Sequence, residues 1–156
     1  MGNRIEGFDN DAYAFYYITQ GNAAASAAIT AGTPVEVGGT ATAGPVNDFT
    51  IATASGGRAT YNGPGGTFHI SVGMSMTSTK SNENMLFYVA IDGTEDAASE
   101  ALRKLGTGAD LGRGATGCIT ALTTGQYVEV FVDLAASSSD TVTANTLQVR
   151  ITQVGP

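Results

Sequence analysis

The chain has 156 residues, of which 42% are hydrophobic and 13% are charged, and its formal net charge is −7 at pH 7. This length fits one domain with a buried core. Seven Lys and Arg against fourteen Asp and Glu argue against a nucleic-acid groove or an anionic membrane surface, because both require clustered positive charge. The sequence shows neither a signal-peptide pattern nor a run of about 18 apolar residues. We therefore expect no membrane span and no conventional secretion.

The first predicted strand follows a polar start, residues 1–12. Residues 13–18 read Tyr-Ala-Phe-Tyr-Tyr-Ile, and alternation with a period of two is typical of β-strands. Residues 21–46 are rich in Ala, Gly and Thr, with a short edge strand expected at 33–37. We interpret residues 1–46 as an N-terminal arm with the first strand or strands. The candidate capsid-contact residues of this arm are Tyr13, Phe15, Tyr16 and Tyr17, although 13–18 can equally be the first strand of a sandwich.

The strongest alternation lies between residues 67 and 91. Apolar residues at every second position are followed by a polar turn and a second alternating stretch. With the turn signals between them, these segments predict a β-sandwich over residues 47–156. Strands are expected at 49–53, 58–61, 67–78, 84–92, 115–122, 126–134 and 146–154. The predicted core contains Phe68, Ile70, Val72, Phe87, Val89, Val128, Val130, Val132, Val149 and Ile151.

Two segments are less regular. Residues 95–105 place Ala and Leu at helical spacing, but 101–105 can equally be a charged edge strand, so helix and strand both stay open. The Gly-rich residues 106–114 lack the Gly-Lys-Ser/Thr ending of a phosphate loop, and a flexible loop between strands is expected there.

Side chains that carry chemistry are sparse and scattered. His69 is the single histidine and lies within a strand, and Cys118 is the single cysteine, expected as a small buried hydrophobe. This composition excludes an ordinary zinc site within one chain. The carboxylates at 92–96 do not have the spacing of a calcium loop. We therefore expect a protein without catalytic residues, cofactor or metal.

Several motifs resemble one type of domain. They are residues 58–63 (Arg-Ala-Thr-Tyr-Asn-Gly), the strand at 68–72, the strand at 85–93 and the entry to a late strand at 122–130, where Gln126 stands in place of a common Asp. Their order resembles the trimeric jelly-roll domains of the TNF/C1q-like type, which phage head decoration (cement) proteins and fibre heads also use. The resemblance implies an all-β, antiparallel jelly-roll (Greek-key) β-sandwich assembled as a trimer, and it brings no catalytic residue.

The functional hypothesis is a homotrimeric capsid decoration protein, made in the host cytoplasm, that binds the major capsid protein on the exterior of the virion. The alternative is a receptor-binding or fibre-tip module that recognises a cell-surface glycan or protein. Aromatic residues are enriched in interface cores, so side chains opposite the predicted core are candidates for the trimer interface. These are His69, Tyr88, Tyr127 and Phe131.

Overall fold

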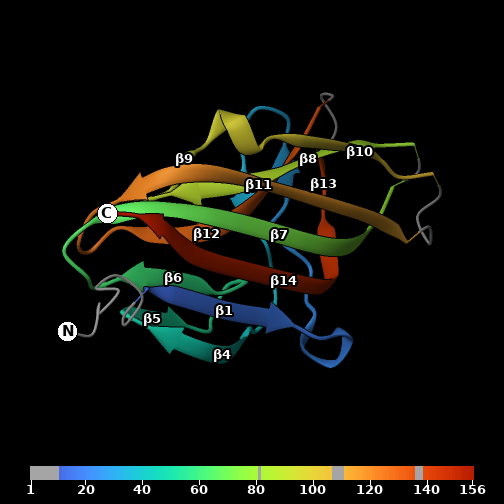
Figure 1. Ribbon diagram of the computed structural model, residues 1–156. Coiled ribbons are helices and arrows are strands. Elements are labelled where there is room, and N and C mark those ends of the chain that lie inside the picture. The colour runs from blue at the N-terminus through green and yellow to red at the C-terminus, as the bar shows by residue number, and fades with distance from the viewer. Residues whose placement is uncertain (1–10, 81, 107–110, 136–138) are drawn as a thin grey trace, which may run out of the picture.

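A computed structural model describes residues 11–80, 82–106, 111–135 and 139–156. It is an antiparallel jelly-roll β-sandwich (Figure 1). The five-stranded sheet has the order β11-β7-β14-β1-β4, and the second sheet has the order β10-β8-β12-β6-β5, with β3 beside β12 and β9 beside β8. β13 and β2 form a separate pair. The described helices are short 3₁₀ turns, and none of them is long and apolar enough to span a membrane.

The elements follow one another along the chain with these bounds: β1 Tyr13–Ile18, η1 Gln20–Asn22, β2 Ile29–Thr30, β3 Val35–Glu36, β4 Thr42–Asn47, β5 Phe49–Ala52, β6 Arg58–Tyr61, β7 Gly66–Ser78, β8 Asn84–Ile91, β9 Thr94–Glu95, η2 Ala97–Ser99, β10 Ala101–Lys104, β11 Gly112–Leu122, β12 Tyr127–Leu134, β13 Ser139–Asp140 and β14 Val142–Gly155.

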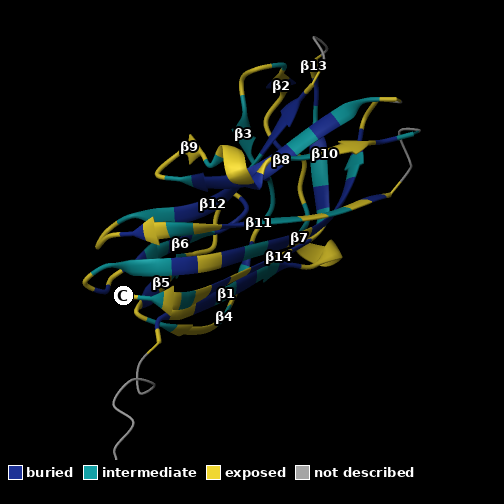
Figure 2. Ribbon diagram, turned by 45° about the horizontal axis from the view of Figure 1, so that its top comes forward, coloured by how far each residue is buried: buried dark blue, intermediate teal, exposed yellow. Residues whose placement is uncertain are grey.

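Strand β7 organises the five-stranded sheet because it pairs along its length with β11 on one side and β14 on the other. The register places Ile70 beside Cys118 and Ile151. Since side chains alternate across a strand, this register sends all three into the core, where each is buried. Buried and exposed bands alternate along β7 and β14 in Figure 2.

Aromatic rings fill one end of the space between the sheets. Tyr61 lies 5.0 Å from Phe49 and 4.8 Å from Phe68, measured between ring centroids. The second contact is edge-to-face, an arrangement that adds to the stabilisation from area burial. Every predicted core residue is buried, so the prediction from alternation is confirmed.

Tertiary structure decided the irregular segments. Residues 95–105 contain the turn η2 and the strand β10, so the strand interpretation was right and the helix was wrong. The predicted loop at 106–114 is wrong at its end, because 112–114 belong to β11, while 107–110 lie outside the described residues. Strand β4 was not predicted, because its Gly and Pro disguise an edge strand that β1 pairs with on one side. Of the polar start, only 11–12 are described.

We predict that Phe87→Ala lowers the free energy of unfolding by roughly 3–5 kcal/mol. The ring is 1% exposed, and a Cβ atom added at Gly114 would come within 2.4 Å of it, so the ring fills its site tightly. Chemical denaturation measures the loss. Leu102→Ala is the control, because Leu102 is 61% exposed and its truncation should change stability by less than about 0.5 kcal/mol. Equal effects of the two substitutions would contradict the assignment.

Candidate functional site

The surface of the five-stranded sheet that points away from the core is named the outer face here. It is formed by the alternate residues of five strands that are distant in sequence. β7 contributes a row of small and polar residues, β1 contributes aromatic residues, and β14 and β11 contribute the flanks. The outer face includes Tyr13, Phe15, Tyr17, His69, Ser71, Gly73, Ser75, Thr77, Arg113, Ala115, Ile119, Thr146, Gln148, Arg150 and Thr152.

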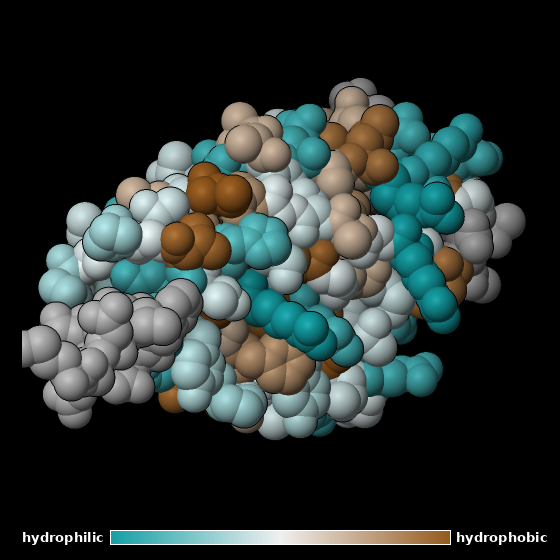
Figure 3. All heavy atoms as spheres, viewed as in Figure 1, coloured by the Kyte–Doolittle hydropathy of each residue, from teal (hydrophilic) through white to brown (hydrophobic). Residues whose placement is uncertain are grey.

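One end of the outer face is aromatic and apolar. Phe15 stacks on Tyr17 with 5.5 Å between ring centroids, and the Arg150 guanidinium lies 5.5 Å from the Phe15 centroid. Tyr13 is 43% exposed and borders a depression of about 440 Å³. Ile119, across the sheet, is 68% exposed. Figure 3, seen from the same side as Figure 1, shows brown hydrophobic residues among pale ones on this surface.

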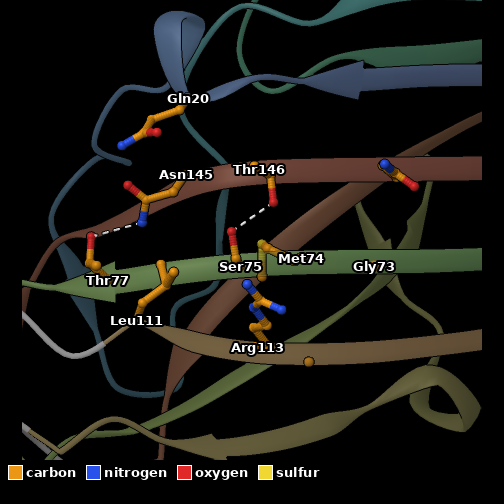
Figure 4. A pocket seen from close by; sticks show the side chains of 11 residues that line it. Gln20, Gly73, Met74, Ser75, Thr77, Leu111, Arg113, Asn145 and Thr146 are labelled. Carbon is orange, nitrogen blue, oxygen red and sulfur yellow. Dashed lines mark hydrogen bonds between the residues drawn. The ribbon is translucent and has the colours of Figure 1, made fainter.

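The other end holds a polar groove of about 700 Å³ (Figure 4). The Ser75 and Thr146 hydroxyls are hydrogen-bonded at 2.6 Å, and Asn145 Nδ2 donates to Thr77 Oγ1 at 3.2 Å. These bonds join β7 to β14 and hold four polar side chains in place. The lining residues are Gln20, Gly73, Met74, Ser75, Thr77, Leu111, Arg113, Gly114, Asn145, Thr146 and Gln148.

The five-stranded sheet contains no Asp or Glu in any of its strands, although the whole chain carries fourteen. Its outer face holds His69 and two cations, Arg113 and Arg150. Among the described residues, neither arginine forms an ion pair. The outer face is therefore free of negative side chains on a protein with a net charge of −7.

The second sheet holds a cluster of charged side chains. Arg58 Nη2 lies 3.1 Å from both Glu36 Oε1 and Glu129 Oε2, which ties β6 to β3 and β12. The Arg58 guanidinium also lies 4.0 Å from the centroid of Tyr127. Burial, followed by the hydrogen bond and charge of Glu36, raises the pKa of Glu129 to about 7, with Arg58 acting in the opposite direction. Two carboxylates thus share one guanidinium.

The structure separates the candidate trimer-interface residues. His69 is exposed on the outer face of the five-stranded sheet, whereas Tyr88, Tyr127 and Phe131 belong to β8 and β12 in the other sheet. Tyr88 is 1% exposed and its ring centroid lies 6.2 Å from that of Phe131. Burial, and then the charge of nearby carboxylates, raises the pKa of Tyr88. Its side chain therefore packs within the protomer.

The aromatic residues of the predicted arm lie on both faces of their strand. Residues 13–18 form a strand between β14 and β4, so the strand interpretation is confirmed. Tyr13, Phe15 and Tyr17 point outward, but Tyr16 is 0% exposed and lies in the core. The expectation that all four offer a contact surface needs this correction, because alternation sends adjacent residues to opposite faces.

The remaining candidate groups are engaged in the fold. Asp92 accepts hydrogen bonds from Gln126 Nε2 and the Tyr127 backbone N–H, both at 3.0 Å, and Asp96 caps η2. Burial and then Asp96 raise the pKa of the buried Cys118 thiol to about 12, so it behaves as the expected small hydrophobe. Within the described residues, no group of three or more His, Cys, Asp or Glu is placed to hold a metal.

Sequence reasoning missed the polar groove. Its main residues come from β7, β11 and β14, and Ser75 meets Thr146 across 71 positions of sequence. Alternation could have placed Ser75 and Thr77 on the face opposite the core, because they share parity with His69. No local signal shows which strand lies beside them.

Comparisons with known proteins show the fold alone. The chain matches no protein-family model and no curated protein. It is structurally similar to Eiger TNF from S. frugiperda, with 11% identity, 93% of each chain covered and a TM-score of 0.50. For murine APRIL at pH 5.0 the identity is 6%, the coverage 91% of this chain and 99% of the other, and the TM-score 0.56. For PRD1 vertex protein P5 the identity is 12%, the coverage 92% of this chain and 96% of the other, and the TM-score 0.51.

We predict that Glu129→Gln changes how stability depends on pH. The folded carboxyl has a pKa of about 7 against an ordinary 4.5, so folding favours its protonated form. The stabilisation that the protonated carboxyl gives to the folded state is fully present below pH 4.5 and is lost as the pH rises to about 7. The variant should match the wild type at low pH and exceed its free energy of unfolding at pH 8 by roughly 2 kcal/mol. Denaturant titrations across this range measure the difference.

Asp48→Asn is the matched control, because it also removes one carboxylate and Asn tolerates the positive φ of 56° at this position. Between low pH and pH 8, the free energy of unfolding of the control should change with pH as that of the wild type does. A Glu129→Gln variant with an unchanged slope would show that the shared guanidinium neutralises both carboxylates.

Proposed function

We propose that this protein is a homotrimeric, non-enzymatic virion structural protein that decorates and stabilises the capsid. The observation that carries the proposal is the aromatic and apolar end of the outer face, on a sheet without a single carboxylate. Interface cores are depleted in charge and enriched in aromatic residues. Tyr13, Phe15 and Ile119 offer that composition at the surface of the protomer.

The threefold symmetry of a trimer limits which surfaces of the subunit can form the contact between subunits. A ring of three forms through a head-to-tail contact between two different patches of each subunit, and these patches lie on neighbouring sides of the subunit rather than opposite ones. The outer surfaces of the two sheets point in opposite directions. We therefore assign one patch of the trimer contact to the aromatic end of the outer face, with His69. Tyr13 and Phe15 are then trimer contacts in place of the capsid contacts expected from the sequence. Tyr127 and Phe131, on the other sheet, are assigned to a separate contact with the capsid.

The similarity in fold to PRD1 vertex protein P5 supports a place in a virion, and the resemblance to TNF/C1q-like domains supports the trimer. A trimer presents each capsid-binding surface three times. Linked contacts bind far more tightly than single ones when the geometry allows them to engage together. Weak individual contacts with neighbouring capsid subunits would then suffice to strengthen the shell.

A second candidate is a module that recognises a cell-surface glycan. The polar groove favours it, because seven of the lining side chains can form hydrogen bonds and none of them is acidic. Particles that lack this protein separate the two functions. Loss of the capsid's resistance to heat indicates decoration, whereas intact particles that no longer adsorb to cells indicate recognition.

We predict that the purified protein has three times the 15.8 kDa mass of the chain in light scattering across a wide concentration range. Tyr13→Glu should weaken the trimer by about 30-fold or more, because it places a charge in an interface core. Thr50→Glu, on the exposed surface of β5, is the control and should remain trimeric. A monomer at all concentrations would contradict the trimer.

A further inference from the structure

The polar groove keeps hydrogen-bonding groups that the fold does not use. Asn145 Nδ2 donates to Thr77 Oγ1 at 3.2 Å and to the Thr143 carbonyl at 3.4 Å, and no described residue donates to the Asn145 Oδ1 acceptor. In the 2.6 Å pair of Ser75 and Thr146, one hydroxyl donates to the other. The accepting hydroxyl keeps its own hydrogen for another partner.

The charge of the groove selects for an anion. Arg113 is exposed, forms no ion pair with any described residue, and lies on a sheet without carboxylates. A guanidinium presents donors in a planar fork that matches a carboxylate. The described lining contains no acidic side chain to repel a negative ligand or to compete for the arginine.

The shape and the apolar parts of the groove suit a ring-shaped ligand. The exposed Leu111 borders the polar residues, and Gly73 leaves the surface of β7 without a side chain (Figure 4). A volume of about 700 Å³ is within the range of small-molecule sites, which combine apolar walls with a few polar groups that fix orientation. A sugar ring has the complementary character, with apolar C–H faces and a polar rim.

We propose that this groove binds a carboxylate-bearing sugar, with the carboxylate on Arg113 and the ring hydroxyls on Ser75, Asn145 and Gln148. The site begins at Gln148, the partner of Tyr17 in β14, and extends along β7 away from Tyr13 and Phe15. This proposal rests on the second candidate function, recognition of a cell-surface glycan, and specifies the ligand as a sugar acid at the end of that glycan.

The test compares two methyl glycosides that differ in one group. Methyl glucuronide carries the carboxylate and methyl glucoside carries a hydroxymethyl group in its place. In titration calorimetry with the full chain, we expect the glucuronide to bind at least about tenfold more tightly, because charge-assisted hydrogen bonds are the stronger ones. Arg113→Gln should reduce this preference to none. Arg103→Gln, an equal loss of charge on the exposed strand β10, should leave it intact.

A second variant blocks the groove without disturbing the fold. A Cβ atom added at Gly73 meets no atom within 4 Å, so Gly73→Leu brings a side chain into the groove without a clash at its first atom. We expect the wild-type melting temperature and complete loss of glucuronide binding. Methyl sialoside, a bulkier sugar acid, should behave as the glucuronide does towards both variants.

Three results would overturn the proposal. They are equal affinity for glucuronide and glucoside, binding that survives Gly73→Leu, and no saturable binding of either sugar acid below about 50 mM. None of them bears on the trimer, because light scattering reports the oligomeric state separately. A trimer that binds no sugar acid would leave the decoration function standing and remove this site.

Discussion

The pairing of β7 with β11 and β14 is the constraint on which the rest of the structure depends. Side chains alternate along a strand, so one register decides the two surfaces of a sheet together. The register that buries Phe68, Ile70 and Val72 also turns His69, Ser71 and Gly73 outward. A slip by one residue would exchange the core and the outer face, and the cost of exposing the apolar row keeps the polar groove in place.

The buried carboxylates of the described residues lie outside the strands of the five-stranded sheet, although Asp140 bonds to Ser78 at the end of β7. The buried carboxylates lie in β12 or β13, and each has partners. Glu129 meets Arg58, Asp133 accepts from the Gly32 N–H, and Asp140 accepts from Ser78, Thr79 and the Thr141 N–H. These hydrogen bonds outweigh burial and lower the pKa of Asp140. No strand of the five-stranded sheet contains a carboxylate, so Arg113 and Arg150 have no acidic neighbour within their own sheet.

The outer face thus offers two environments on one rigid support. Its aromatic end provides apolar area at low cost in conformational entropy, which suits contact with another protein. Its polar end provides fixed donors and acceptors around Arg113, which has no ion-pair partner among the described residues, and this combination suits a small charged ligand. Both ends lie on strands rather than loops, and sites on strands are held in position by the core beneath them. A structural role and a recognition role can therefore occupy the same sheet.

The sequence by itself determined the fold class and the core. Alternation is a local signal, and it identified the strands around Phe68, Phe87, Val130 and Val149 because each pattern lies within one segment. It also limited the chemistry, since one His and one Cys cannot form an ordinary zinc site within one chain.

Only the tertiary structure decided the site. The neighbours of a strand are set by pairing between distant segments, so nothing local could place Ser75 beside Thr146, or Arg58 between Glu36 and Glu129. For the same reason Tyr16 and Tyr17, adjacent and chemically alike, have opposite positions. One completes the core and the other belongs to the outer face, because the side of the sheet is a property of the assembled sandwich and not of the residue.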